Sequence, residues 1–276
     1  MPLADAHISP LDRGFLFGDA VYEVVPVYEG KPFLLDAHLD RLQHSLEAIR
    51  LKNPFSRSKW EEILGELIDQ NGGGTIALYF QISRGADAGR DHPFPANVPL
   101  TVFAMAQPLQ PISDSVLEHG IAVVTMDDLR WARCDIKATS LLPNVVLRQM
   151  AADRNAAEAI LVRDGLAMEG TSSSIFAIVD DTLITPPKST SRLPGTTRDF
   201  ILELAADEGV PSEECEIRVE SLKGAAEIWI SSAAREVIPV TRLDGQPVGT
   251  GQPGTYWRRI YDRFQARKAA LGELPA

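Results

Sequence analysis

The stretch RCDIKATSLLPNVVLRQMAADRNAAEAILVRDGLAMEGTSSSIFAI, residues 133–178, sets the expected fold of this 276-residue chain. Its spacing of apolar residues predicts a helix near residues 144–154, followed by apolar segments that are typical of buried strands. Short strands are expected at 121–125, 158–162, 174–179 and 227–231, with a further helix at 198–207. Short strands interrupted by single helices favour a mixed sheet or a partly open barrel with helices outside it.

The N-terminal third predicts a smaller sheet with two helices packed on it. A valine-rich segment at 20–27 and the turn Glu29-Gly30-Lys31 indicate a hairpin. Asp36 is expected to cap a helix with apolar residues at helical spacing over 39–49, and a second such helix follows over 60–68. Strands are expected near 76–82 and 101–105, with a polar, turn-rich stretch at 85–97 between them.

The segment Gln107-Pro108-Leu109-Gln110-Pro111 predicts a stiff connector, because each proline fixes its own φ and favours an extended residue before it. We therefore expect a small α/β domain at 1–106, an interdomain linker at 107–117 and a larger domain at 118–276. The predicted fold class is α/β in the broad sense (α+β), with a mixed, barrel-like sheet in the larger domain. An apolar stripe predicts that a last helix near 256–270 docks on that domain.

Composition and charge restrict the classes of function. A formal net charge of −11 leaves no basic excess to neutralise a nucleic-acid backbone, so small molecules are the expected partners. Cys134 and Cys215 lie outside any CxxC pattern, which excludes a disulfide framework, and the scattered histidines do not argue for a metal site. No apolar run is long enough to cross a bilayer, and the N-terminus lacks the pattern of an export signal. We expect a cytoplasmic protein with no membrane partner.

Lys137 differs from the other lysines, which lie in polar or turn contexts. It follows a strand and a cluster of charges, and it precedes the small-residue turn Ala138-Thr139-Ser140. A lysine held at a strand end near arginines can have its ammonium form disfavoured, and the neutral amine is the form that attacks a carbonyl carbon. A surface ion pair is the alternative that these residues leave open.

The sequence as a whole resembles the class IV aminotransferases, and among them the enzymes that act on D-amino acids. The likeness is carried by the stretch at 133–178 and by four shorter motifs, which are DRGFLFGDAVYEV at 12–24, HLDRL at 38–42, LPGTTRDF at 193–200 and EIWISSAAREVIPV at 227–240. It extends over nearly the whole chain. It implies the two-domain architecture of the fold-type IV enzymes that use pyridoxal phosphate.

The resemblance implies pyridoxal 5′-phosphate as the cofactor and assigns residues to it. Lys137 matches the lysine that forms a Schiff base with the cofactor and moves the proton at the substrate Cα. Glu169 matches the carboxylate beside the pyridine nitrogen, and Arg41 matches the arginine that binds the phosphate. The other positions that match the cofactor site are Ser172, Ser173, Thr196, Thr197, Ser232 and Ala233.

On the residues alone, several of these assignments have a plainer alternative. Glu169 could be a turn carboxylate that faces water, and Arg41 could form an exposed pair with Asp40 or Glu47. Thr196 and Thr197 come just before a helix predicted to begin at Arg198. Free N–H groups at that helix end favour an anion, but threonine is also a common N-cap residue.

Three further matches concern the substrate. Tyr22 matches a tyrosine that lines the active site, although a strand tyrosine is commonly a packing residue. Arg90 and His92 match the Arg-x-His pair with which D-amino-acid enzymes hold the substrate α-carboxylate. Without the resemblance they would be interpreted as solvated loop residues. In this family the loop reaches the active site of the neighbouring subunit, so a homodimer is implied.

The implied reaction is a transamination from a D-alanine-like donor to a 2-oxo acid such as 2-oxoglutarate. The alternatives are a branched-chain L-amino-acid or (R)-amine transaminase of the same fold, an aminodeoxychorismate lyase, and a non-catalytic scaffold. Two positions depart from the family pattern. Ser174 stands where asparagine is common, and Ala233 stands where a threonine hydroxyl often contacts the phosphate. Losing one neutral hydrogen bond weakens cofactor binding by about 1 kcal/mol.

Overall fold

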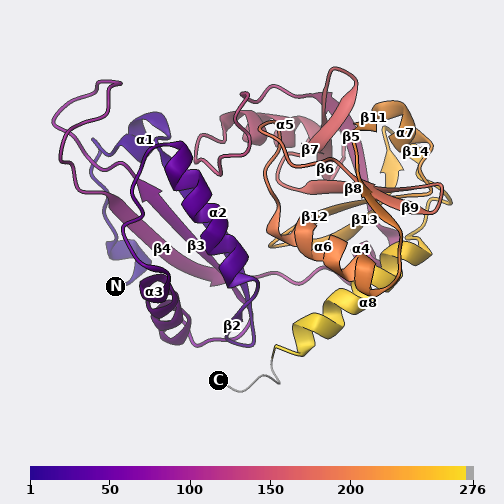
Figure 1. The fold of residues 1–276 in the computed structure, drawn as a ribbon, viewed down its shortest axis with the longest axis horizontal. Coiled ribbons are helices and arrows are strands. Elements are labelled where there is room, and N and C mark those ends of the chain that lie inside the picture. The colour runs from indigo at the N-terminus through magenta and orange to yellow at the C-terminus, as the bar shows by residue number, and fades with distance from the viewer. Residues whose placement is uncertain (272–276) are drawn as a thin grey trace. The chain divides into compact units, whose positions relative to one another are not determined.

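The computed structural model describes residues 1–271, and the chain divides into two compact units (Figure 1). The first unit comprises Met1–Leu109 and Ile136–Leu141, and the second comprises Gln110–Asp135 and the chain from Leu142 onward. Residues 136–141 fall in the first unit, although the expected boundaries placed them in the larger domain. The reason is packing, because Ile136 lies in the core of the first unit and Ala138 forms an antiparallel bridge with Val21.

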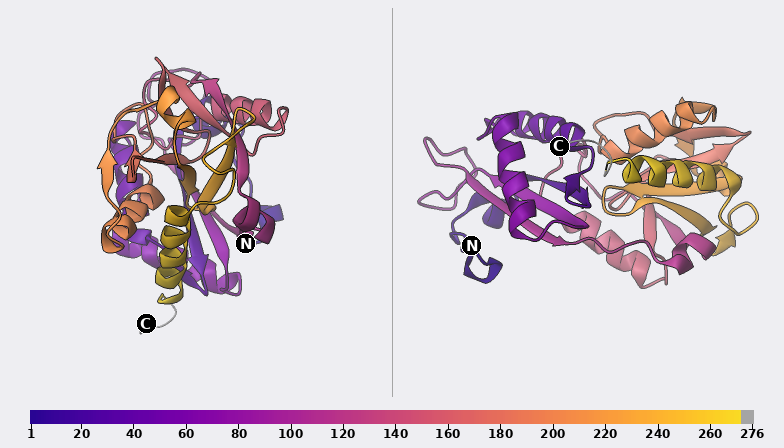
Figure 2. Two further views of the ribbon diagram at one scale, coloured as in Figure 1. Left: turned by 90° about the vertical axis from the view of Figure 1, so that its right-hand side faces the viewer. Right: turned by 90° about the horizontal axis from the view of Figure 1, so that it is seen from below.

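An antiparallel sheet in the order β2-β1-β3-β4 forms the first unit. Its strands are β1 (Ala20–Tyr28), β2 (Lys31–Pro32), β3 (Ile76–Ser83) and β4 (Thr101–Pro108). Strands β1 and β2 make the expected hairpin. Helices α2 (Leu35–Ala48) and α3 (Arg57–Gln70) pack on this sheet (Figure 2), since their leucines and Trp60 share one apolar core with β1 and β3. The short elements η1 (Leu3–Asp5) and α1 (Arg13–Phe17) precede the sheet.

Helix α2 begins in a way that the sequence did not indicate. Its N-cap is Leu34, whose φ is 55° and whose side chain makes no capping bond, while Asp36 lies inside the first turn. The prediction that Asp36 is the cap is therefore wrong. An acidic residue in the first turn still stabilises the helix, because it faces the positive end of the helix dipole.

The second unit is built on a ten-stranded sheet with the path β10-β9-β8-β12-β13-β5-β6-β7-β11, to which β14 adds beside β13. Strand β5 runs parallel to both β13 and β6, and β9 runs parallel to β10, whereas the other pairs are antiparallel. The expected mixed sheet is thus confirmed. The bounds are β5 (Ile121–Asp127), β6 (Glu158–Arg163), β7 (Leu166–Gly170), β8 (Ser174–Val179), β9 (Thr182–Thr185), β10 (Ser212–Glu214), β11 (Ile217–Arg218), β12 (Glu227–Ser232), β13 (Glu236–Leu243) and β14 (Gln246–Pro247).

Helices lie outside this sheet, as expected from the sequence (Figure 1). They are α4 (Asp114–His119), α5 (Leu142–Ala152), α6 (Thr196–Asp207), α7 (Val219–Lys223) and α8 (Thr255–Ala269). The last helix docks on this unit through buried Trp257, Ile260 and Phe264, and the Phe264 ring meets Phe200 of α6 edge-on at 5.3 Å. Helix α6 begins two residues earlier than predicted, so Thr196 and Thr197 belong to its first turn.

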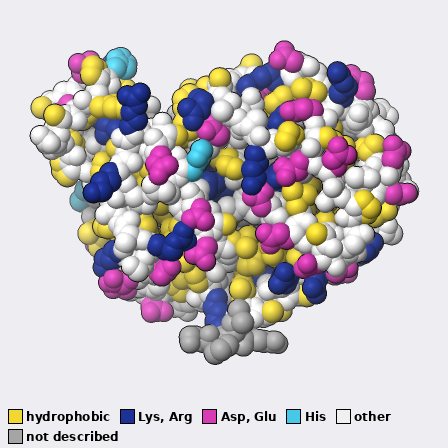
Figure 3. Space-filling model, in the orientation of Figure 1, with side chains coloured by type: hydrophobic (Ala, Val, Ile, Leu, Met, Phe, Trp, Pro, Cys, Tyr) yellow, Lys and Arg dark blue, Asp and Glu magenta, His cyan; other side chains and the backbone are white. Residues whose placement is uncertain are grey.

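The surface carries charges of both signs. Basic and acidic side chains are interspersed over the face shown in Figure 3, in keeping with the formal net charge of −11. None of the helices in residues 1–271 combines the length and the apolar character needed to cross a membrane.

Candidate active site

Lys137 lies in the first unit, held against strand β1. The backbone N–H of Tyr22 donates to the Lys137 carbonyl at 3.0 Å, and the Lys137 N–H donates to the hydroxyl of Ser45 on α2 at 3.1 Å. The Lys137 amine lies 4.3 Å from the centroid of the Tyr22 ring. The structure therefore brings together Lys137 and Tyr22, and backbone contacts fix the place from which the amine extends.

Arg41 belongs to a buried cluster that spans β1 and α2. Its Nε and one Nη each donate at 2.8 Å to the two carboxylate oxygens of Glu23, and His38 Nδ1 lies 2.8 Å from the same carboxylate. Glu23 and His38 are almost wholly buried, and Arg41 is only 7% exposed. This burial excludes the alternative of an exposed pair with Asp40 or Glu47. The Glu23 carboxylate and the His38 ring therefore hold the Arg41 guanidinium in a fixed position at the edge of the apolar core.

The charges in this cluster shift its pKa values in a consistent sense. Burial alone would raise the pKa of Glu23, but the adjacent Arg41 guanidinium and His38 outweigh burial and hold that pKa well below its usual range. The pKa of His38 is lowered, mainly by burial, even though its bond to Glu23 opposes the change. At neutral pH the cluster thus contains an ionised Glu23, a charged Arg41 and a neutral His38.

Arg90 and His92 lie on an exposed loop of the first unit that follows β3. The Arg90 guanidinium lies 4.9 Å from the centroid of the Phe17 ring, and the His92 ring lies 5.3 Å from the same ring. Arg13 donates from its two Nη atoms to the backbone carbonyls of Asp91 and His92, at 2.6 and 2.9 Å. Helix α1 therefore holds the loop that presents both side chains.

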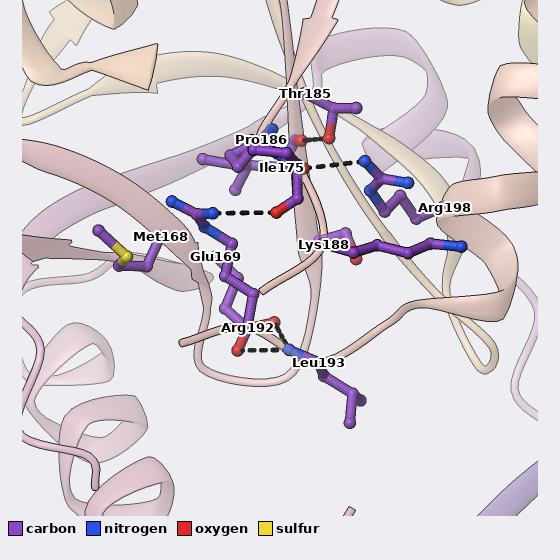
Figure 4. Close-up of a pocket in the computed structure, with 11 residues that line it drawn as sticks. Met168, Glu169, Ile175, Thr185, Pro186, Lys188, Arg192, Leu193 and Arg198 are labelled. Atoms are coloured by element: carbon purple, nitrogen blue, oxygen red, sulfur yellow. Dashed lines mark hydrogen bonds between the residues drawn. The ribbon is translucent and has the colours of Figure 1, made fainter. Parts of the chain in front are cut away.

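Glu169 is a buried residue of β7 in the second unit. Figure 4 shows the Leu193 backbone N–H directed at its carboxylate, with distances of 3.2 Å to each oxygen. Arg130 donates to the same carboxylate. Burial raises the pKa of Glu169, although Arg130 and the Leu193 N–H act in the opposite direction. Its burial excludes the alternative of a turn carboxylate that faces water.

The turn after β7 carries Ser172 and Ser173 and closes over Glu158. This carboxylate accepts from the Thr171 N–H at 3.2 Å and from the Ser173 hydroxyl at 3.2 Å. Asn144 of α5 donates to the Thr171 carbonyl at 2.7 Å. The turn therefore has a defined conformation in which the Ser172 side chain is exposed.

Donors for an anion gather near helix α6 and strand β12 of the second unit. Thr196 and Thr197 are buried at the start of α6, whose N-cap is Gly195 and has no side-chain bond, so the alternative that a threonine only caps this helix does not hold. Helix α6 also packs on β12, where the buried Ser231 hydroxyl has no hydrogen-bond partner among the described residues. Ser232 ends β12 and Ala233 follows it.

These residues fit pyridoxal phosphate. An uncapped helix N-terminus and an orphaned buried hydroxyl suit a phosphate, which accepts several hydrogen bonds. A buried carboxyl with a raised pKa, such as Glu169, suits a ring nitrogen with which it can share a proton. Each of these features lies within the second unit, and Lys137 with its ordered backbone lies within the first.

The sequence interpretation missed the side chains that support these groups. Four such residues are Glu23, Glu158, Arg13 and Arg235, each of which forms a hydrogen bond with a predicted site residue or its backbone. One signal was present for Glu23, since a charged residue in a valine-rich strand has to be paired if it points inward. Glu158 is a weaker signal of the same kind, because it is a charged residue at the first position of the apolar strand β6.

Comparisons with known proteins cover both units. The family model for amino-transferase class IV matches residues 20–243. The D-alanine aminotransferase of Bacillus licheniformis is 40% identical over 265 residues, which are 96% of this chain and 93% of that protein. The D-alanine aminotransferase of Staphylococcus aureus strain COL is 38% identical over 263 residues, which are 95% of this chain and 93% of that protein.

Solved structures agree in fold. The branched-chain amino acid aminotransferase of Escherichia coli matches with a TM-score of 0.91 at 28% identity, covering 96% of this chain and 91% of that one. A second branched-chain amino acid aminotransferase, from T.th. and solved with pyridoxamine 5′-phosphate, matches with a TM-score of 0.90 at 25% identity and covers 100% of this chain and 92% of its own.

Proposed function

Because the chain belongs to the class IV aminotransferase family, we propose that it transfers the amino group of D-amino acids, with D-alanine or a similar donor, to a 2-oxo acid such as 2-oxoglutarate. The protein is an aminotransferase that depends on pyridoxal phosphate, and its substrates are small molecules, namely amino acids and keto acids. The observation that carries the choice of D-amino acids is the loop with Arg90 and His92. Relatives named D-alanine aminotransferases at 40% and 38% identity support it.

The proposed roles follow from what each side chain can do. Pyridoxal phosphate, when bound, accepts the amino group and draws electrons from the reacting carbon. Lys137 carries the cofactor, and its Nζ, restricted by the Tyr22 ring at 4.3 Å, takes up and returns a proton. Glu169 would accept a hydrogen bond from the cofactor ring nitrogen and so keep that nitrogen protonated, while Arg130 and the Leu193 N–H hold its carboxylate in place.

Several hydrogen-bond donors are assigned to the phosphate of the cofactor. In the first unit Arg41 keeps its guanidinium oriented through Glu23. The other proposed donors are the N–H and O–H groups of Thr196, Thr197, Ser172 and Ser232 and the backbone N–H groups of Ser173 and Ala233, since the Ser173 hydroxyl already donates to Glu158.

Arg90 and His92 are assigned to the substrate α-carboxylate. Two donors that converge on one carboxylate fix its orientation, and the orientation decides which face of Cα is presented to the proton-transferring amine. Phe17 lies 4.9 Å from the Arg90 guanidinium and 5.3 Å from the His92 ring, so both side chains are held beside one aromatic surface. Tyr22 lines the site beside Lys137.

We also propose a homodimer, in which the loop with Arg90 and His92 serves the neighbouring subunit. Helix α5 supports a second copy as partner, because Leu142, Val145, Val146 and Met150 are exposed on it at helical spacing. Trp131 and Leu129 are further exposed apolar residues of the same unit. Light scattering after gel filtration should give twice the chain mass, and Val145→Asp with Val146→Asp should yield monomers. A monomeric wild-type protein would refute this arrangement.

We propose a cytoplasmic location as well, for which the two free thiols, Cys134 and Cys215, are the support. Fractionation of the native cells, with the protein followed by antibody, tests it. Recovery in an extracellular or periplasmic fraction would contradict it.

The second candidate is a transaminase of branched-chain L-amino acids. The likeness to the Escherichia coli branched-chain enzyme, with a TM-score of 0.91, favours it. Identity is lower there, at 28% against the 40% of the Bacillus licheniformis D-alanine aminotransferase.

The visible spectrum of the purified protein separates the candidates. With cofactor bound, D-alanine should bleach the absorption band and yield pyruvate, and 2-oxoglutarate should restore the band, while L-alanine and L-leucine should not act. Lys137→Ala should lower the rate by about 10³-fold or more, because the proton-transferring amine is lost. Turnover of L-leucine but not of D-alanine would replace the first candidate by the second. Unchanged D-alanine turnover in Arg90→Met with His92→Gln would remove the assignment of those two residues.

A further inference from the structure

Glu158, the first residue of β6, is a buried carboxylate that has no role in the proposed reaction. Its side chain is 0% exposed, yet it accepts hydrogen bonds from several donors that are remote in sequence. A buried carboxylate on an apolar strand is costly unless it is paired and fully hydrogen-bonded. The cost implies that this position has a function other than packing.

The first group of donors to Glu158 belongs to the turn at residues 171–173. The Thr171 N–H and hydroxyl and the Ser173 hydroxyl bind one carboxylate oxygen or the other, and the Ser172 hydroxyl lies 3.4 Å away. The approach is so close that a Cβ on Gly170 would lie 2.1 Å from the Ser173 hydroxyl and 3.3 Å from the Glu158 carboxyl carbon. Glycine at position 170 is therefore required for the turn to close on the carboxylate.

The second donor is Arg235, in the turn at residues 233–235 that joins β12 to β13. Its Nη2 donates to the Glu158 carboxylate and, at 3.1 Å, to the Ser172 hydroxyl. Arg235 therefore contacts the turn at 171–173 directly and also through Glu158. The contact joins two turns that are 63 residues apart in sequence, and both carry residues assigned to the cofactor phosphate.

We propose that Glu158 and Arg235 are positioning residues that hold the turns at 171–173 and 233–235 in one arrangement, and that this arrangement sets the affinity for the cofactor phosphate. The inference rests on the proposed function, because that function assigns Ser172, Ser173, Ser232 and Ala233 to the phosphate. Preorganised donors bind more tightly than donors that must first be ordered. Arg235 orders the hydroxyl of Ser172, which is otherwise exposed.

The opposite charges of Glu158 and Arg235 also help to hold the two turns together. The carboxylate of Glu158 offsets the charge of Arg235, so the guanidinium is held in place and not drawn towards solvent. Ala233 lies two residues before Arg235 in the same turn and has no hydroxyl to offer. The turn therefore depends on Arg235 for a side-chain contact with the neighbouring turn.

The test is a measurement of cofactor affinity in the full-length enzyme. Apoenzyme of the wild type, Glu158→Gln, Arg235→Met and the double variant is dialysed to equilibrium against pyridoxal phosphate, and the dissociation constant is determined. Each single variant should bind about tenfold or more weakly. The double variant should bind no more weakly than the worse single variant, because both substitutions remove the same contact. With cofactor saturating, the KM for D-alanine should stay within twofold of wild type.

Two controls keep the result interpretable. Arg242→Met removes an exposed arginine from neighbouring β13 and should bind within twofold of wild type. Arg235→Lys keeps the charge and should fall between wild type and Arg235→Met, and it remains informative if Glu158→Gln does not fold. Circular dichroism of each apoenzyme establishes that it is folded.

The outcomes separate the two proposals. Dissociation constants within twofold of wild type in Arg235→Met, or single effects that multiply in the double variant, would overturn the positioning role while a transaminating wild type upholds the proposed function. A wild type that binds no pyridoxal phosphate would overturn both.

Discussion

Two segments of the first unit carry arginines assigned to anionic groups, and they are held in opposite ways. Arg41 lies on a regular helix, is 7% exposed and shares a carboxylate with buried His38. Arg90 lies on an irregular, exposed loop and touches the edge of the unit through the Phe17 ring. One cation is fixed by charge and burial, and the other depends on a loop held by a few contacts.

The difference matches the group that each arginine is proposed to bind. A cofactor phosphate stays in place throughout turnover, so a preorganised cation that costs no ordering on binding suits it. A substrate carboxylate enters and leaves in every half-reaction, and loops of low local stability suit that exchange. Substitutions of the supporting side chains should therefore affect stability in the first segment and substrate affinity in the second.

The largest effect is expected from Glu23→Gln. It leaves the Arg41 charge buried without its carboxylate, and removing one partner of a buried pair costs about 3–5 kcal/mol. The free energy of unfolding of the apoenzyme in urea measures this directly. Glu47→Gln, an exposed substitution on the same helix, should change that free energy by less than about 0.5 kcal/mol. A Glu23→Gln protein as stable as wild type would show that the cluster is not what fixes Arg41.

An intermediate effect is expected from Arg13→Lys. The arginine joins Asp19 to the backbone carbonyls of Asp91 and His92, and a lysine cannot reach all three acceptors at once. The loop should then be less ordered, and the KM for D-alanine should rise about tenfold, which corresponds to about 1.4 kcal/mol.

The readout that separates positioning from general damage is the split between kinetic constants. In Arg13→Lys the kcat and the cofactor band should stay close to wild type, since Lys137 and Arg41 are not touched. Arg57→Lys, an exposed arginine paired with Asp36 and Asp40, serves as the control and should leave KM unchanged. A fall in kcat with KM unchanged would mean that Arg13 does not act through the loop.

Much of this molecule could be predicted from the sequence, because its strands and long helices have clear apolar patterns. Lys137 stands out through its neighbours in the sequence, whereas Arg41 and Glu169 are assigned only through a resemblance, and the structure shows why. The partner of Arg41 lies 18 residues away in sequence and Arg235 lies 77 residues from Glu158, so neither contact leaves a local pattern. Helix α1 has five residues, too few for a helical period to be visible.

The start of α6 shows a different limit. The sequence predicts a helix that begins at Arg198, and threonine just before a helix is a common N-cap residue. The helix instead begins after Gly195 without a side-chain cap. A local rule assumes that the helix itself must satisfy its first N–H groups, whereas an anion can do so when the helix end is part of a binding site.

The smallest expected effect is a pH dependence of the stability, which arises from His38 in the buried cluster around Arg41. The pKa of His38 is lowered in the folded protein, chiefly by burial, with Arg41 and Lys137 acting in the same direction and Glu23 opposing them. Between the unfolded pKa near 6.5 and the lower folded pKa, the unfolded chain binds more protons than the native one. Stability from this residue is thus fully present above about pH 6.5 and is lost as pH falls below it.

Unfolding in urea between pH 8 and pH 5.5 should reveal this loss by comparison with His38→Asn. The wild type should lose up to about 1 kcal/mol more than the variant over that range, since one pKa unit corresponds to about 1.36 kcal/mol. The lowered pKa of Glu23 acts in the same sense but only below about pH 4.5, so it does not contribute in this range. His44→Asn, on the exposed side of α2, should keep the wild-type slope. If the free energy of unfolding falls with pH equally in the wild type and in His38→Asn, His38 takes up a proton in the folded protein without cost. The cluster around Arg41 would then be no more rigid than the Arg90 loop, and the proposed difference between the two segments would fail.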